Sequence, residues 1–421
     1  MKPQCIQVTT QWWLPVIIGL VLLPWAMASG ASTKLDEQLM QAAAHGDLPQ
    51  VKSVLEKGAD VNCASDHGRT PLMQAALEGH LDVVKLLVEN GAAINSKCQS
   101  GMTALGYAAV RRNSAVARFL LRSGADLTLP IAATFGNIRG AQGLISQGVN
   151  VNRRHWNFGG QTALMLAAMA GNAAMVRLLI SKGSAVNART TWPGPGWTAL
   201  MSAARGGDIK TMELLISKGA RVNDRTENGE TALNIAAGEG NIELAKLLIA
   251  KGAHVNSKPE VGKTALMAAV AGKRNNVELT KLLIADGARV NSKTPNGWTA
   301  LMSAARQGDV KILDLLIAKG ADVNARTEDG ATVLMHAAEG GNPEVLRLLI
   351  AKGADVNART EDGATALMYA AEAGKLEAVK LLIADGCSVN ARTSFGETAL
   401  ALAEGIGWDK VARYLKEHGG K

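Results

Sequence analysis

The sequence predicts an all-α solenoid of about twelve helix-turn-helix units joined by short β-hairpin-like loops. The first observation is a period of 33 residues, because EDGATVLMHAAEGGNPEVLRLLIAKGADVNART at 328–360 is followed at once by EDGATALMYAAEAGKLEAVKLLIADGCSVNART at 361–393. The second is a pair of short apolar helical patterns in each period, separated by glycine. Such self-similarity is typical of stacked repeats, in which each unit packs only on its neighbours.

The third observation is the composition. Hydrophobic residues make up 47% of the 421 residues, but aromatic residues only 4%. This combination favours helices that pack through Ala, Leu and Ile, and a solenoid can extend to this length without a single large core.

The first 28 residues differ from the rest of the chain. Lys2 precedes an apolar run from Trp12 to Trp25, which is followed by Ala26-Met27-Ala28. A basic start, a short apolar run and a small-residue site are typical of a secretory signal peptide. Residues 1–28 therefore predict export to a periplasm or beyond, with 29–34 as a linker. Inner-membrane anchoring is the alternative, although the run is shorter than the roughly 20 residues of a membrane span.

Residues 35–421 are predicted to form one repeat domain of twelve units, numbered here as repeats 1 to 12 in chain order. The segment 35–65 lacks the opening of the other repeats and predicts an N-terminal cap repeat, and 394–421 turns polar at its end, as a C-terminal cap requires. A threonine opens each of the ten complete repeats, the C-terminal cap included, at Thr70, Thr103, Thr162, Thr198, Thr231, Thr264, Thr299, Thr332, Thr365 and Thr398.

The spacing of these threonines is interrupted once by a large step, from Thr103 to Thr162. The segment AATFGNIRGAQGLISQGVNVN lies between them and matches the later part of a repeat. We therefore predict a truncated repeat over 130–155, which lacks the loop and the turn that should precede it.

Repeat 10 shows how each unit is expected to fold. Thr332 suits the N-cap of the first helix, and Asn342, with Pro343 behind it, suits the start of the second. Gly353 suits the left-handed residue that ends the second helix. The asparagine that closes GADVN, Asn357 in this repeat, is expected to tie adjacent loops together through side-chain hydrogen bonds.

The T-x-L-x-x-A-A pattern, the central glycine and the closing GADVN resemble the ankyrin repeat over about residues 35–421. The resemblance implies an all-α ankyrin-repeat solenoid that binds a protein through the concave face made by its loop tips and first helices. Thr70-Pro71-Leu72 keeps the T-P-L of the family, whereas most repeats read T-A-L-M. We expect these methionines, in the position that the family gives to histidine, to form a buried packing ladder.

No pattern of catalytic residues accompanies the repeats. The seven histidines include no pair spaced for a shared metal, and C-x-x-C, H-E-x-x-H, G-x-S-x-G and glycine-rich phosphate loops do not occur. Cys63, Cys98 and Cys387 give no disulfide framework. The sequence therefore predicts neither an enzyme nor a cofactor or metal site.

Candidate binding residues are aromatic side chains in loops and at the two positions that vary between repeats. One of these positions lies directly before the opening threonine, and the other lies directly before the Ala-Ala pair. They include Tyr107, Trp298 and Tyr369. Trp156, Phe158, Trp192 and Trp197 cluster in the two repeats that follow the truncated one. Either these rings bind a partner, since exposed aromatic residues are enriched in interface hot spots, or they fold down over the gap left by the missing loop.

A basic residue recurs two positions after the closing asparagine, for example Arg189, Arg225, Arg326 and Arg359. Two interpretations remain, a solvated charge ladder or a track for an acidic partner.

We conclude from the sequence that the chain is a non-catalytic scaffold or adaptor, predicted to be a monomer, that binds a protein of unknown identity, with an acidic surface as one option. A secreted effector that binds a host protein and a membrane-anchored spacer are the alternatives. The net charge of +8 is too diluted to predict nucleic-acid binding, and membrane contact is expected only if residues 1–28 are retained.

Overall fold

The computed structural model describes residues 34–191, 196–260, 262–272 and 276–421. These residues form 24 α-helices and one short 3₁₀ helix, without a strand. Two isolated antiparallel bridges, His155 with Gln161 and Arg326 with Thr332, lie in the predicted hairpin-like loops. The all-α repeat fold is confirmed, whereas the predicted signal peptide and the side chain of Trp192 lie outside the described residues.

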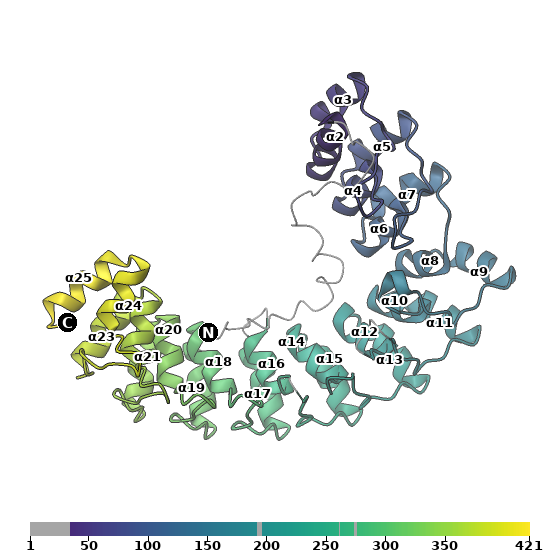
Figure 1. Cartoon of the computed structure of the whole chain (residues 1–421). Coiled ribbons are helices and arrows are strands. Elements are labelled where there is room, and N and C mark those ends of the chain that lie inside the picture. Colours follow the sequence, from purple (N-terminus) through teal and green to yellow (C-terminus); the bar gives the residue numbers. More distant parts are fainter. Residues whose placement is uncertain (1–33, 192–195, 261, 273–275) are drawn as a thin grey trace. The chain divides into compact units, whose positions relative to one another are not determined.

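Each repeat contributes two helices, and in Figure 1 the first and second helices of successive repeats form two rows within each part of the chain. The first helices are α2 (Lys34–His45), α4 (Pro71–Glu78), α6 (Ala104–Val110), α8 (Leu129–Phe135), α10 (Ala163–Met169), α12 (Ala199–Gly206), α14 (Ala232–Gly238), α16 (Ala265–Ala271), α18 (Ala300–Gln307), α20 (Val333–Gly340), α22 (Ala366–Glu372) and α24 (Ala399–Ile406). The second helices are α3 (Leu48–Glu56), α5 (Leu81–Glu89), α7 (Ser114–Arg122), α9 (Ile138–Ser146), α11 (Ala173–Ser181), α13 (Ile209–Ser217), α15 (Ile242–Ala250), α17 (Val277–Ala285), α19 (Val310–Ala318), α21 (Pro343–Ala351), α23 (Leu376–Ala384) and α25 (Asp409–Glu417). The 3₁₀ helix η1 (Trp156–Phe158) lies in the loop before α10.

The described chain divides into two compact units. The N-terminal unit extends to Gly206 and includes Ser217–Ala220, and the C-terminal unit comprises Gly207–Ile216 and Arg221–Lys421. Within each unit the first helices of neighbouring repeats pack together, as α4 does on α6 and α18 does on α20.

The core of each unit consists of small and medium side chains. The first helices bury their Ala-Leu-Met and Ala-Ala positions, and the methionines Met73, Met165, Met201, Met267, Met302, Met335 and Met368 are almost completely enclosed. The predicted methionine ladder is therefore confirmed. Most second helices bury three positions, as α21 does with Val345, Leu346 and Leu349. Each such side chain contributes about 1.5–3 kcal/mol when it is fully buried.

The helix ends follow the predicted chemistry. In repeat 10 the Thr332 hydroxyl accepts a hydrogen bond from the backbone N–H of Met335 (3.3 Å), and the Asn342 side chain accepts one from Glu344 (2.9 Å). These bonds satisfy donors that a helix start leaves open. Gly353 has a φ of 89°, which is the left-handed conformation predicted for the end of α21. Among the described residues, no helix combines the length and apolar character needed to cross a bilayer.

Candidate functional site

The closing asparagines clamp each loop to the next repeat. The Asn62 side chain donates to the carbonyl of Gly91 (3.3 Å) and accepts from the N–H of Ala93 (2.7 Å), and Asn357 makes the same pair of bonds with Gly386 (3.3 Å) and Ser388 (2.8 Å). The predicted structural role of these asparagines is confirmed. The same donor bond recurs from Asn95, Asn152, Asn187, Asn223, Asn256, Asn291, Asn324 and Asn390.

A second set of side chains joins the turns between the two helices of each repeat. His80 contacts the carbonyl of Ala44 (3.1 Å), Asn342 donates to that of Gly308 (2.9 Å), and the Trp408 indole donates to that of Glu372 (2.9 Å). All three occupy equivalent positions and reach the preceding repeat. The histidine and this tryptophan therefore serve the frame of the solenoid.

The asparagine clamp is missing where the truncated repeat begins. Thr128 stands in the asparagine position, and it starts α8 without a side-chain cap bond. Helix α9 behind it buries only Ala141, whereas other second helices such as α21 bury three residues. The joint between repeats 3 and 4 is consequently weaker than that between repeats 4 and 5, where Asn152 again forms the clamp.

Two side chains reach past repeat 4 from either side. Arg112 is the one non-glycine residue with positive φ (57°) in the described chain, and its guanidinium donates to the carbonyl of Met169 (2.6 Å), two repeats further on. From repeat 5, the Trp156 ring lies beside Gly101 of repeat 3. A Cβ atom added to Gly101 would be only 3.2 Å from Cζ2 of the Trp156 ring. The loops of repeats 3 and 5 have thus become neighbours across the missing loop.

The structure separates the clustered aromatic residues into two groups. Trp156 is 61% exposed, whereas Phe158 (8%) and Trp197 (4%) lie in the interior. The backbone N–H of Trp197 donates to the Thr190 hydroxyl (2.8 Å), and the Arg205 guanidinium lies 5.7 Å from the Trp197 ring centre. Phe158 and Trp197 therefore offer little area to a partner in this conformation, and Trp156 offers most of its ring.

Tyr107, another predicted binding residue, is only 3% exposed. Its hydroxyl accepts a hydrogen bond from Arg69 Nε (3.1 Å) and lies 3.4 Å from the Cys98 sulfur. Burial and the contact with Cys98 raise the pKa of Tyr107 and outweigh the opposing effect of Arg69. In this structure Tyr107 is a hydrogen-bonded part of the N-terminal unit's interior.

In the C-terminal unit, three rings from consecutive repeats form a row. Trp298 precedes α18, His336 lies in α20 and Tyr369 lies in α22. The Trp298 and His336 ring centres are 4.3 Å apart, and those of His336 and Tyr369 are 6.1 Å apart with nearly perpendicular planes. The Trp298 indole donates to the Ser303 hydroxyl (2.7 Å). The row brings together two of the predicted residues with a histidine that was not among them.

His336 is 7% exposed, and neither ring nitrogen has a hydrogen-bond partner. Its Nδ1 is 3.7 Å from Glu339 Oε2, which is too long for a hydrogen bond. Arg306 pairs with the same carboxylate at 2.5 Å. Partial burial raises the pKa of Glu339, but His336 and Arg306 outweigh it and leave this pKa below its ordinary value.

The predicted basic residues are exposed, and several are bound to the backbone of the next repeat. Arg225 donates to the carbonyl of Lys258 (2.6 Å), Arg326 to that of Arg359 (2.8 Å) and Arg359 to that of Arg392 (3.3 Å). Arg189 is exposed as well. Arg225, Arg326 and Arg359 therefore have a structural function in the C-terminal unit, and the use of all four arginines in binding stays a prediction.

No group of three or more His, Cys, Asp or Glu side chains suited to a metal ion occurs in the described residues. Burial, together with Asp36 and Asp60, raises the pKa of Cys63 to about 12, and burial raises that of Cys387 to about 11. Both thiols are therefore poor nucleophiles and poor metal ligands near neutral pH.

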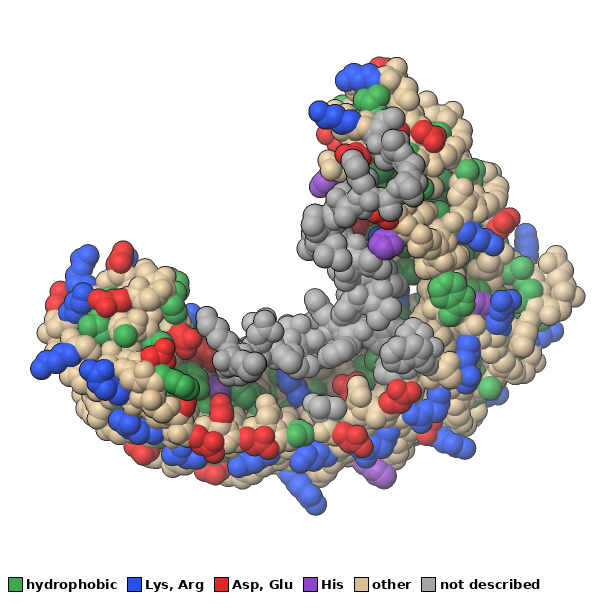
Figure 2. Space-filling view, viewed as in Figure 1, with side chains coloured by type: hydrophobic (Ala, Val, Ile, Leu, Met, Phe, Trp, Pro, Cys, Tyr) green, Lys and Arg blue, Asp and Glu red, His purple; other side chains and the backbone are tan. Residues whose placement is uncertain are grey.

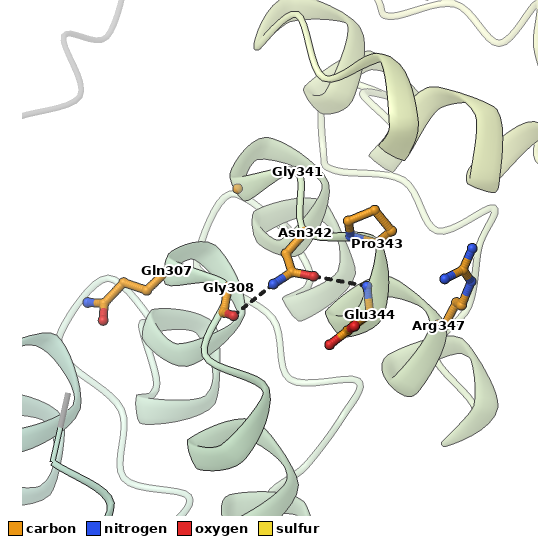
Figure 3. A pocket seen from close by; sticks show the side chains of 8 residues that line it. Gln307, Gly308, Gly341, Asn342, Pro343, Glu344 and Arg347 are labelled. Carbon is orange, nitrogen blue, oxygen red and sulfur yellow. Dashed lines mark hydrogen bonds between the residues drawn. The ribbon is translucent and has the colours of Figure 1, made fainter.

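An open hollow lies between the turns of repeats 9 and 10 (Figure 3). Gly308, Gly341, Asn342 and Pro343 line it, with Glu344 and Arg347 at its edge. Its central contact is the Asn342 bond that joins the two repeats. The hollow is thus a by-product of the frame and has no converging set of ligand-binding groups.

The fold and these surfaces define a helical-repeat module with a rigid frame and variable loops. The family model described as "Ankyrin repeats (3 copies)" matches residues 39–130, 129–226, 164–259, 219–294, 235–327, 270–360 and 334–421. The chain belongs to the ankyrin-repeat family, whose repeats form a protein-protein interaction module. None of the curated proteins compared with the chain matches it.

Sequence reasoning missed His336, Arg306 and Glu339 as a group. The only available signal was a histidine before the Ala-Ala pair, one of the positions that vary between repeats. The pairing of Arg306 with Glu339 depends on a one-repeat step, because the two residues are 33 positions apart.

Proposed function

We propose that this chain is a non-catalytic scaffold or adaptor that captures a protein on the loop tips and first helices of its C-terminal unit. The observation that carries the proposal is the row of Trp298, His336 and Tyr369. These three side chains occupy variable positions in consecutive repeats. The buried imidazole between the two aromatic rings makes no hydrogen bond, and the nearest carboxylate oxygen, Glu339 Oε2, is 3.7 Å from its Nδ1. Leaving a buried polar group without a hydrogen bond costs about 1–3 kcal/mol, so this place is not optimised for the stability of the unbound chain.

Aromatic anchors with a charged rim are typical of interface hot spots. Trp298 and Tyr369 are partly exposed, and Arg306 and Glu339 stand beside them. The asparagine clamps hold the repeats on both sides, which lowers the ordering cost of binding. A partner would therefore gain affinity from a surface that is already in place.

The test combines affinity capture from a cell extract with a binding assay on the captured protein. Replacing Trp298 and Tyr369 by alanine should weaken binding by about tenfold or more, since hot-spot side chains carry most of the binding energy. Ile209→Ala is the matched control, because Ile209 is exposed on second helix α13 of the same unit. The proposal fails if the double variant binds as the wild type does while its thermal unfolding is unchanged.

We also propose that the chain is exported, which rests on Lys2, the apolar run from Trp12 to Trp25 and the Ala26-Met27-Ala28 site. A scaffold of the cell envelope should stay with the envelope on fractionation, whereas a secreted effector should appear outside the cell. A membrane-anchored spacer is the third candidate. It predicts that the Trp298 and Tyr369 double variant keeps full function in the cell.

A further inference from the structure

The positive charge of this chain is concentrated in one segment. Residues 90–206 contain twelve Lys and Arg residues and a single acid, Asp126, which gives a net +11. The remaining 33 basic and 36 acidic residues nearly cancel. The cations are Lys97, Arg111, Arg112, Arg118, Arg122, Arg139, Arg153, Arg154, Arg177, Lys182, Arg189 and Arg205. All of them lie in the N-terminal unit, in the truncated repeat and in the repeats on either side of it.

The second helices show where carboxylates are absent from this segment. In α15, α17 and α23 a Glu pairs with a Lys three residues later, at 3.0, 2.8 and 2.8 Å. At the equivalent positions of α7 and α11, alanines replace the glutamates, and Arg118 and Arg177 remain without this ion pair. In Figure 2 blue side chains gather over α9 to α11 with little red between them, whereas red and blue alternate over α16 to α21.

The missing loop of repeat 4 concentrates part of this charge around one aromatic ring. Because Trp156 reaches Gly101, the loop that follows Lys97 lies beside the loop that contains Arg153 and Arg154. Lys97, Arg153 and Arg154 are exposed, and in the described part of the chain they make no ion pair and no hydrogen bond through their side chains. We call these three residues and Trp156 the basic face.

The equivalent arginines of the C-terminal unit serve as a comparison. Arg326 and Arg359 occupy the same loop position as Arg154, but they donate to backbone carbonyls of the next repeat. Glu328 and Asp329 follow Arg326 in the same loop. The C-terminal loops are therefore neutralised and tied down, and the basic face is neither.

We propose that the basic face binds an acidic polypeptide segment, an inference that rests on the proposed function as a protein-binding module. Arginine suits this partner because its guanidinium can hold a carboxylate through two parallel hydrogen bonds. Trp156 adds exposed apolar area to the loops that carry these charges, a combination that is typical of protein interfaces.

The same surface fits other polyanions less well. Within 90–206, Trp156 is the single large hydrophobic side chain that is exposed among the described residues. Lipid surfaces are usually held by a continuous apolar face, and single-stranded nucleic acids by several stacking rings. One ring among cations matches a peptide that presents carboxylates around one apolar side chain.

The experiment measures binding of a fluorescent oligoglutamate peptide with one central leucine to the full chain, by anisotropy at low and moderate salt. The double variant Arg153→Gln, Arg154→Gln should lose about tenfold in affinity through the loss of charge-assisted hydrogen bonds. Trp156→Ala leaves the charge unchanged and should lose about threefold or more. The matched control is Arg326→Gln with Arg359→Gln, which removes the same charge and should change affinity by less than about twofold.

Three results would overturn the proposal. An equal loss in the control would show a general charge effect, and an unchanged affinity of Trp156→Ala would show that no built site exists. Tighter binding of a single-stranded oligonucleotide or of phosphatidylserine vesicles, lost in the same variants, would assign the face to another class of partner. Since Trp298 and Tyr369 take no part in this assay, its failure leaves the proposed function of the C-terminal unit standing. Failure of the Trp298 and Tyr369 test likewise leaves this assay valid.

Discussion

Repeats 3 to 5 of the N-terminal unit and repeats 9 to 11 of the C-terminal unit use the same two-helix frame, but they are joined differently. In repeats 9 to 11, Asn324 and Asn357 clamp each loop to the next, and Arg326 and Arg359 bind backbone carbonyls. In repeats 3 to 5, Thr128 replaces the clamp, and single side chains reach past repeat 4.

This difference teaches how the loop side chains of a repeat protein change their use where the period breaks. Where the period is kept, the loop asparagines and arginines bind the neighbouring repeat, and the partly exposed rings of Trp298 and Tyr369 remain for a partner. Where the period breaks, Lys97, Arg153, Arg154 and Trp156 are left exposed. In a solenoid, stability is approximately the sum of each repeat and its two interfaces, so a local defect weakens one joint and leaves the remaining joints intact.

The largest expected difference in stability between the two regions concerns one leucine position that their second helices share. Leu349 of α21 is fully buried, whereas the equivalent Leu144 of α9 is only partly buried. Leu349→Ala should lower the free energy of unfolding by about 3 kcal/mol, and Leu144→Ala by about 1 kcal/mol, because less area and a smaller cavity are involved. Urea unfolding followed by far-UV circular dichroism measures both, and equal losses would contradict the weaker packing of repeat 4.

A smaller effect is expected from the clamps. Asn357→Ala removes the bonds to Gly386 and Ser388 and leaves two backbone groups without them. The expected loss is about 1–2 kcal/mol, since each hydrogen bond contributes about 1 kcal/mol. Hydrogen exchange should show faster opening of repeat 12 than of repeat 9. Uniform protection along the C-terminal unit would argue against clamps that act locally.

Variants of Arg112 test whether its hydrogen bond to Met169, which extends past repeat 4, adds to the stability of the N-terminal unit. Alanine at this position loses the bond to Met169 but keeps the positive φ of 57°, whereas glycine loses the bond and relieves the strain. Arg112→Ala should therefore be less stable than Arg112→Gly by about 1 kcal/mol. Thermal melts of the two variants and the wild type measure the order of their stabilities. If alanine equals glycine, the backbone at this position is not strained.

A pH dependence is expected for the N-terminal unit through His155. Burial and the nearby Arg153 lower the pKa of His155 from 6.5 to about 4. The unfolded chain therefore takes up a proton at higher pH than the folded chain, and stability falls as the pH drops from about 6.5 to about 4. His155→Gln should flatten this part of the stability profile. A profile identical to that of the wild type would exclude His155 as its source.

Much of the frame was predictable because its chemistry is local. The threonine caps, the glycine at the end of second helices and the closing asparagines depend on residues within one or two periods, and the structure confirms them at Thr332, Gly353 and Asn357. The methionine ladder was predictable for the same reason. The row of Trp298, His336 and Tyr369 was only half predicted, since its geometry depends on stacking between repeats.

By itself, the sequence determined the period, the fold class, the caps and the place where the pattern breaks, because these follow from residue types at fixed spacing. Tertiary structure decided which side chains are exposed. Trp156 and Trp197 both precede a first helix by a few residues, yet one is exposed and the other buried. The physical reason is the missing loop of repeat 4, which brings the Trp156 ring against Gly101, whereas Trp197 lies in the interior beneath Arg205.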